Sequence, residues 1–79
     1  MSPTVFIFKG YRFFFFSKEE RRPHAHVSCA DGEAKFWLDP NVELVKNYGL
    51  SKVQIAEIQK IVEERRDELI RAWLSHFRS

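Results

Sequence analysis

The feature that most constrains this chain is the segment 23–40, which alternates apolar and polar residues on either side of Asp31-Gly32. A type I′ turn of two residues needs positive φ at both central positions, and glycine adopts positive φ without steric cost. We therefore predict a β-hairpin that turns at Asp31-Gly32.

This turn sorts the side chains of the hairpin onto two faces, because successive residues of a strand point to opposite sides. The predicted pairing places His26 opposite Trp37 and His24 opposite Asp39. One face is apolar and consists of Ala25, Val27, Cys29, Ala34, Phe36 and Leu38. The other face is polar and consists of His24, His26, Ser28, Glu33, Lys35, Trp37 and Asp39. We expect the apolar face to join the core and the polar face to be exposed, with any binding or chemistry on the polar face.

A second hairpin is predicted from Thr4 to Ser17, where two β-branched and aromatic runs flank Lys9-Gly10. Both faces of this hairpin are apolar, which a sheet with one side in water does not tolerate. We expect one face to be covered by a helix and the other by another chain or by the C-terminal tail.

The last third of the chain predicts one helix from Ser51 to Phe77. Ser51 and Gln54 have the spacing of a capping box, which satisfies two backbone N–H groups at a helix start. The helix would be ~40 Å long at 1.5 Å per residue. Because this exceeds the reach of a sheet of short strands, Trp73 and the end of the helix should overhang or pack on a neighbour. The preceding segment, 42–48, fits a short strand and two helical turns equally well.

Together these elements predict a single α+β domain over residues 1–79, with two β-hairpins forming a four-stranded, mainly antiparallel sheet followed by one long C-terminal α-helix. The sequence has no apolar run that could span a bilayer and no signal-peptide pattern. Its single cysteine excludes an internal disulfide and fits a reducing compartment. We therefore expect a cytoplasmic protein without a membrane partner, and a net charge of +2 is a weak indication of nucleic-acid binding.

The polar face of the 23–40 hairpin carries the residue types that metal-independent ribonucleases use. His24 or His26 would act as general base, oriented by Asp39, and Lys35 would stabilise the charge that develops on phosphorus. Trp37 would stack a base. A hydrogen-bonded pair of His24 and Asp39, with His26 packed against Trp37, is the structural alternative, and we prefer it.

Two further interpretations concern metal and DNA. His24 and His26 with Asp39 fall short of a zinc signature, so we expect no metal ion and no other cofactor. Gly49-Leu50-Ser51 resembles the turn of a helix-turn-helix, provided that the segment 42–48 is helical. A metal-binding or DNA-binding regulator therefore stays open as an alternative.

The aromatic residues of the first hairpin and of the helix end predict a protein interface. The candidates are Phe14, Phe16, Trp73 and Phe77. A dense apolar patch on a small protein usually marks a protein contact. We expect a homo-oligomer or a complex with another small protein.

Over nearly its whole length the chain resembles a small prokaryotic family named domain of unknown function 4160. The resemblance is carried by Pro3-Thr4-Val5-Phe6, Lys9-Gly10-Tyr11-Arg12-Phe13-Phe14-Phe15, Pro23-His24-Ala25-His26-Val27, Glu33-Ala34-Lys35-Phe36-Trp37-Leu38 and Glu68-Leu69-Ile70-Arg71-Ala72-Trp73. The Pro-His-x-His element is its most specific mark, and Arg22 stands where the fullest family pattern has a further proline. The resemblance implies that members are encoded beside another small protein, in pairs grouped with toxin–antitoxin modules. It implies no catalytic residue.

We therefore predict a small cytoplasmic protein that acts through protein–protein association, as one component of a toxin–antitoxin-like two-gene module. Its partner would be a second copy or a small protein encoded nearby. The alternatives are a metal-independent ribonuclease-type enzyme that uses the His24/His26 face, with RNA as its partner, or a metal-binding or DNA-binding regulator.

Overall fold

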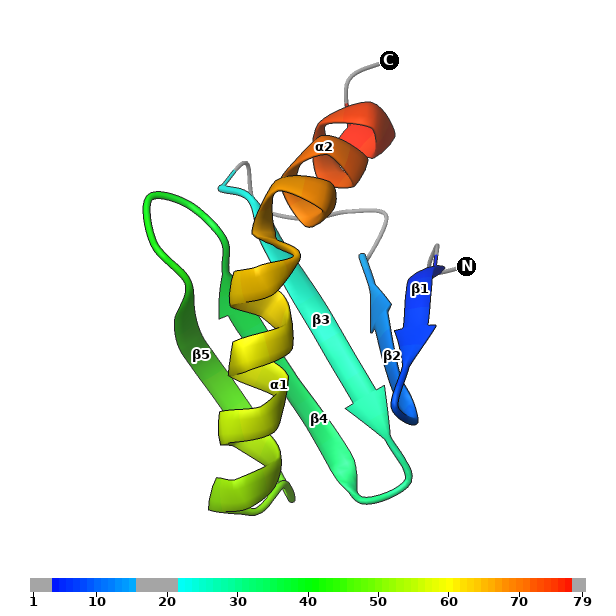
Figure 1. Cartoon of the computed structure of the whole chain (residues 1–79), viewed down its shortest axis with the longest axis vertical. Helices are drawn as coiled ribbons and strands as arrows, with labels where there is room; N and C mark the ends of the chain where they lie inside the picture. The colour runs from blue at the N-terminus through cyan, green and yellow to red at the C-terminus, as the bar shows by residue number, and fades with distance from the viewer. Residues whose placement is uncertain (1–3, 16–21, 78–79) are drawn as a thin grey trace.

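The computed structural model describes residues 4–15 and 22–77, except for the side chain of Phe77. Within these residues it contains one five-stranded antiparallel sheet and two helices (Figure 1). The elements are β1 (Thr4–Phe8), β2 (Tyr11–Phe14), β3 (His24–Cys29), β4 (Gly32–Trp37), β5 (Glu43–Tyr48), α1 (Lys52–Glu64) and α2 (Arg66–Phe77). The strands lie in the order of the sequence, and each pairs antiparallel with the next. The predicted α+β class with an antiparallel sheet is confirmed, but the prediction of four strands and one long helix was wrong.

The β1–β2 hairpin forms as predicted. Lys9 and Gly10 both have positive φ, 53° and 82°, and Phe8 pairs with Tyr11 directly across them. Positive φ at both positions of a two-residue loop is the mark of a type I′ turn, whose twist matches that of the strands. The predicted faces hold next to the turn, but Thr4 rather than Val5 pairs with Phe14, so Val5 is the extra residue of a β-bulge and the predicted alternation ends there.

The β3–β4 hairpin also forms, but its predicted register was wrong. Cys29 pairs with Gly32, so the loop is Ala30-Asp31, and His26 lies opposite Lys35 rather than Trp37. The error is two residues along β4. Because side chains alternate with a period of two, such a shift leaves every residue on its predicted face.

Gly32, which pairs with Cys29, also lies directly against β5. A Cβ atom at this position would overlap the backbone carbonyl oxygen of Tyr48, so β5 approaches as closely as it does only because residue 32 is glycine. The side chain of Asp31 accepts a hydrogen bond from Gln54 Nε2 at 2.8 Å, which joins the turn to the start of α1. Glycine is therefore needed here for close packing and not for positive φ.

The segment 42–48 contains the strand β5, which adds a fifth strand beside β4. Its register shifts at one point, because Lys35 pairs with Lys46 whereas the next residue, Phe36, pairs with Leu44. The intervening Val45 is the extra residue of a β-bulge. Since a helix-turn-helix needs this segment to be helical, that interpretation was wrong.

Helix α1 begins as predicted. Ser51 Oγ accepts a hydrogen bond from Gln54 N at 3.1 Å, and Gln54 Oε1 accepts one from Ser51 N at 2.9 Å. The prediction of one continuous helix was wrong, because α1 ends at Glu64 and Arg65 leaves helical geometry with φ −111° and ψ 20°.

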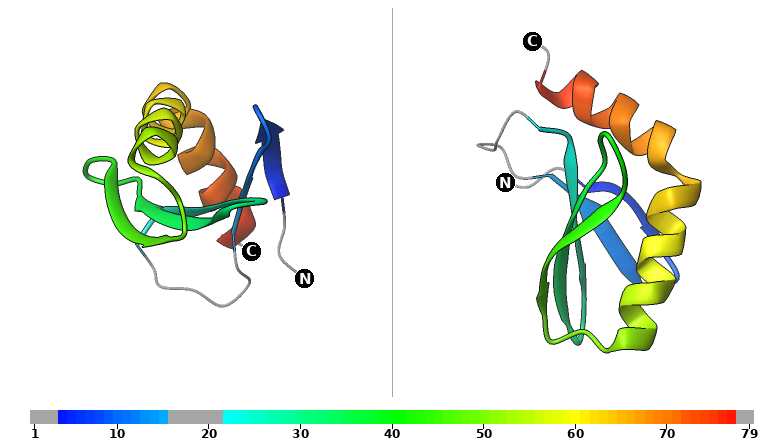
Figure 2. Two further views of the ribbon diagram at one scale, coloured as in Figure 1. Left: turned by 90° about the horizontal axis from the view of Figure 1, so that it is seen from below. Right: turned by 90° about the vertical axis from the view of Figure 1, so that its left-hand side faces the viewer.

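The break coincides with two arginines that interrupt the apolar stripe. The guanidinium carbon of Arg65 lies 4.6 Å from the ring centroid of Phe6 and 4.5 Å from that of Phe8. Arg66 Nε donates a 2.6 Å hydrogen bond to the carbonyl oxygen of Leu38. Both cations therefore have partners without being buried in the core. Helix α2 changes direction relative to α1 and passes over the end of the sheet where β3 begins (Figure 2).

The core lies between the helices and one face of the sheet (Figure 2). It consists of Tyr11, Phe13, Phe15, Ala25, Val27, Ala34, Phe36, Leu38, Leu50, Ile58, Ile61, Val62, Leu69 and Trp73. The apolar hairpin face is therefore in the core, as predicted. Among the described residues, no helix combines the length and the apolar character needed to cross a membrane.

Candidate functional site

The polar face of the β3–β4 hairpin, which the sequence predicts to be exposed, is buried at three of its seven residues, whereas Glu33 and Asp39 are exposed. The exposed fractions are 0% for His24, 9% for His26 and 8% for Lys35. The expectation of an open polar surface at these positions was therefore wrong.

His24 lies at the centre of a cluster of rings. Its ring centroid is 5.3 Å from that of His26, 5.8 Å from that of Trp37 and 6.4 Å from that of Trp73, all in edge-to-face geometry. Edge-to-face contacts place the positive edge of one ring on the negative face of another. Nδ1 of His24 donates a 2.7 Å hydrogen bond to the backbone oxygen of Arg22. The bend between α1 and α2 brings Trp73 to this cluster, and the sequence periodicity gave no sign of that bend.

Cations cover the outer part of the cluster. The guanidinium carbon of Arg22 lies 4.3 Å from the Trp37 ring centroid, and Lys35 Nζ lies 4.8 Å from it. Cation–π contacts of this kind are worth about 0.5–1 kcal/mol at exposed sites and more when desolvated. The ring predicted to stack a base is therefore already in contact with two cations.

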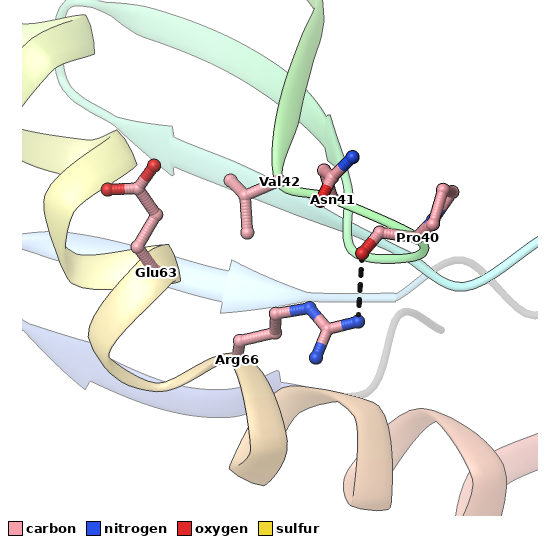
Figure 3. A pocket seen from close by; sticks show the side chains of 5 residues that line it. All are labelled: Pro40, Asn41, Val42, Glu63 and Arg66. Carbon is pink, nitrogen blue, oxygen red and sulfur yellow. Dashed lines mark hydrogen bonds between the residues drawn. The ribbon is translucent and has the colours of Figure 1, made fainter.

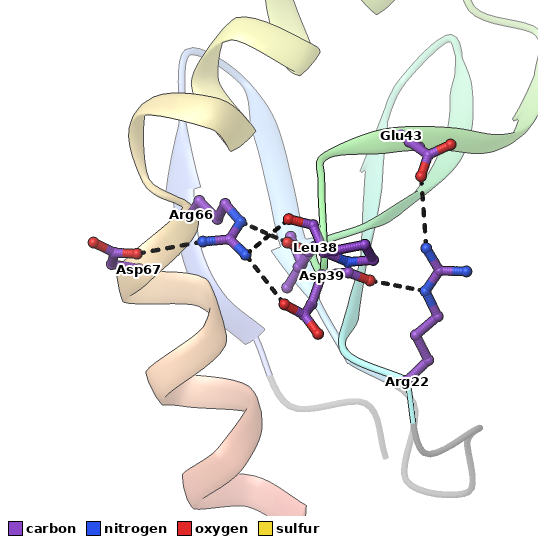
Figure 4. Close-up of polar contacts among 7 residues, drawn as sticks. Arg22, Leu38, Asp39, Glu43, Arg66 and Asp67 are labelled. Atoms are coloured by element: carbon purple, nitrogen blue, oxygen red, sulfur yellow. Dashed lines mark hydrogen bonds and ion pairs between the residues drawn. The ribbon is translucent and has the colours of Figure 1, made fainter.

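Asp39 interacts with two arginines rather than with the histidines. Its carboxylate is 3.3 Å from Arg66 Nη2, and its backbone oxygen accepts a 2.8 Å hydrogen bond from Arg22 Nε (Figure 4). The predicted pairing of His24 with Asp39 was wrong because the register places Trp37 opposite His24. The structure thus brings together three of the four predicted catalytic residues, and the fourth helps to hold α2.

A pocket of about 390 Å³ lies beside the α1–α2 junction and is lined by Pro40, Asn41, Val42, Glu63 and Arg66 (Figure 3). The Arg66 guanidinium on its wall donates to the carbonyl oxygens of Leu38 and Pro40 and pairs with Asp39 and Asp67 (Figure 4). These contacts give Arg66 a structural role at the pocket. In the described part of the chain, no three His, Cys, Asp or Glu side chains converge as a metal site would require.

The pKa of Tyr11 is clearly displaced from its ordinary value. Its hydroxyl donates a 2.8 Å hydrogen bond to Glu57 Oε1, and this bond, with burial, raises the pKa of Tyr11 to about 12. Tyr11 therefore stays neutral at ordinary pH and links β2 to α1.

The predicted interface residues are buried within the chain where they are described. Phe14 is stacked on His26 with centroids 5.5 Å apart, and Trp73 belongs to the core cluster. Phe16 lies outside the described residues, as does the side chain of Phe77.

The structure instead exposes apolar side chains on the two outer strands, β1 and β5. The exposed fractions are 69% for Ile7 on β1, and 42% for Leu44 and 63% for Tyr48 on β5. The sequence of β1 predicts that both of its faces are apolar, but not that it lies at an edge, because strand order is not encoded in any local pattern. The sequence of β5 fits a short strand and two helical turns equally well.

Comparisons with known proteins identify a family but no annotated relative. No curated protein and no solved structure matches the chain significantly. A family model matches residues 10–74, a range that runs from the β1–β2 turn into α2 and includes the histidine strand. The chain therefore belongs to the family described as Domain of unknown function (DUF4160), as its Pro-His-x-His element predicts.

Proposed function

We propose that this protein acts through protein–protein association, as one component of a toxin–antitoxin-like two-gene module in the cytoplasm. We further propose that an extended segment of the partner pairs with the outer edge of β1. The gene arrangement that the family resemblance implies supports a neighbouring gene as the source of that partner.

The observation that supports this proposal most is the character of the β1 edge. The strand reads Thr-Val-Phe-Ile-Phe and contains no charged residue. Natural proteins usually protect an outer strand with charges, proline or a β-bulge, since its backbone N–H and C=O groups can pair with another chain. The bulge of β1 lies at Val5, so residues 6–8 form the regular part of this edge. An uncharged outer strand is therefore suited to receive a strand from a partner.

Ile7 is an exposed apolar residue of this edge. Phe8 and Tyr11 close the two-residue turn, and hydrogen-bonded and non-bonded pairs alternate along an antiparallel ladder. Ile7, paired with Arg12, therefore directs its own N–H and C=O away from β2. Its side chain is mostly exposed as well, so both backbone and side chain can contact a partner.

Catalysis on the histidine face receives less support. His24 is completely buried, and Asp39 binds Arg66. A general base must come within hydrogen-bond reach of the proton that it removes. These placements favour a packing role for the His24–Trp37–Trp73 cluster.

The test is co-purification of this chain with the product of the neighbouring gene, followed by titration of the purified pair. Ile7→Lys introduces a charge at the centre of the proposed contact and is expected to weaken binding by about 10–100-fold. Val53→Lys is the matched control, because Val53 is an even more exposed apolar residue and lies on α1. Failure of the wild-type pair to form, or equal binding by the two variants, would contradict the proposal.

A further inference from the structure

We infer that the opposite edge of the sheet, β5, is a separate interface at which two copies of this chain pair antiparallel. The inference goes beyond the proposed function, since it concerns another strand and another partner. It rests on the charges and the bulge of β5.

Strand β5 is exposed along almost its whole length. Five of its six residues are exposed, including Leu44 and Tyr48, and only Val45 is half-buried. Among residues 4–15 and 22–77, no strand pairs with its outer side. Unlike β1, this strand carries one acidic and one basic residue, Glu43 and Lys46. Glu43 Oε1 lies 3.6 Å from Arg22 Nη2 of its own chain, but its side chain is more than half exposed and can also contact a partner.

The bulge places these two charges on the same face of the sheet. Residues three apart on a regular strand point to opposite faces. Here Glu43 pairs with Trp37 and Lys46 pairs with Lys35, and these two β4 residues are two apart and share a face. The extra residue, Val45, is what makes Glu43 and Lys46 neighbours on one side.

Within one copy, Lys46 lies directly opposite another lysine, Lys35. Like charges directly opposite each other on neighbouring strands are unfavourable. A carboxylate on the outer side of Lys46 would offset this repulsion. The β5 edge therefore favours a partner that presents an acidic residue at that point.

A second copy of the chain supplies this carboxylate. When two β5 strands pair antiparallel about a twofold axis between Leu44 and Val45, Glu43 lies opposite Lys46 of the second copy, and the reverse contact forms by symmetry. Leu44 then lies opposite Val45 of the second copy, which covers the exposed leucine. Both bulges meet at the axis, so each strand faces a partner with the same local twist.

The experiment measures the mass of the purified full-length chain by light scattering and sedimentation over a range of concentrations. We expect a dimer whose dissociation constant rises about 10-fold in Glu43→Lys and in Lys46→Glu, since each change replaces two ion pairs with like charges. The double variant E43K/K46E restores both pairs between the copies in reversed orientation, but not the pair of Glu43 with Arg22, and is expected to dimerise more tightly than either single variant. An equimolar mixture of the two single variants is expected to form a mixed dimer.

Lys60→Glu is the matched control, because it makes the same charge change at an exposed position of α1. It is expected to leave the dimer unchanged. A wild-type chain that stays monomeric at all concentrations would overturn the inference, as would a double variant that dimerises no better than the single ones. Binding of the neighbouring gene product is measured separately with Ile7→Lys, so failure at one edge is distinguishable from failure at the other.

Discussion

The two edges of this sheet offer the same backbone groups but different side chains. β1 is uncharged and apolar, whereas β5 carries Glu43 and Lys46 on one face because of its bulge. An apolar edge accepts any strand that covers its side chains, but an edge with fixed charges selects a partner of complementary charge. One small sheet can therefore separate two kinds of association by the charge of its outer strands.

Near each edge a glycine is needed for a different physical reason. Gly10, in the β1–β2 turn, has φ 82° and open space around its Cα, so only its backbone conformation favours glycine. Gly32, at the start of β4, is required because the end of β5 passes directly against it. A substitution at each position therefore probes a different physical requirement.

The largest effect is expected from Gly32→Ala. The added Cβ would overlap the Tyr48 carbonyl oxygen, so β5 would have to move, and we expect a loss of about 3 kcal/mol in the free energy of unfolding. Gly10→Ala is the comparison variant and is expected to cost about 1 kcal/mol, from positive φ alone. Urea denaturation measures both. Equal losses would mean that β5 is not packed against Gly32 as described.

A smaller loss of stability is expected from removing the hydrogen bond by which Tyr11, on β2 beside β1, is joined to α1. Tyr11→Phe removes the hydrogen bond to Glu57 and is expected to cost about 1 kcal/mol at neutral pH. Because the pKa of Tyr11 is raised from 10.0 to about 12 on folding, this contribution is complete below pH 10 and is lost as pH rises towards 12.

Stability measured from pH 8 to 12 checks this prediction. The wild type should approach the Tyr11→Phe variant as the pH rises. Glu57→Gln keeps an oxygen acceptor and is the control for the hydrogen bond itself. A difference between wild type and Tyr11→Phe that does not change with pH would contradict the assignment.

The smallest effect is that of salt, and it separates the two edges directly. Raising the ionic strength from 0.1 M to 0.5 M should weaken β5 pairing by about 3-fold, because exposed ion pairs are screened. Binding at the uncharged β1 edge should change by less than about 2-fold. The same titrations repeated in both buffers provide the measurement. A β1 contact that is more sensitive to salt than β5 would reverse the comparison.

Local features of the fold could be predicted because neighbouring residues decide them. The Lys9-Gly10 turn depends on backbone conformations that glycine permits, and the capping box of Ser51 and Gln54 joins residues three apart. The two faces of the β3–β4 hairpin were predicted correctly although its register was wrong by two residues, because side chains alternate with a period of two along the strand.

The candidate site was less predictable, since its contacts join segments far apart in the chain. Trp73 reaches His24 only because the helix bends at Arg65, and the bend depends on the rings and carbonyl groups that receive the two arginines. The contact between Trp73 and His24 follows from that bend and could not be predicted from the β3–β4 hairpin alone.

Local sequence is sufficient to predict the alternation of β3 and β4, the first turn, the start of α1 and the family, because each depends on residues close together or on a motif. Tertiary contacts determine which strands lie at the edges, where the helix bends and which face of β5 carries its charges. Those features depend on the close approach of β5 to Gly32 and of the arginines to the sheet. Contacts of this kind form only when distant segments are packed together, and packing is a property of the whole fold.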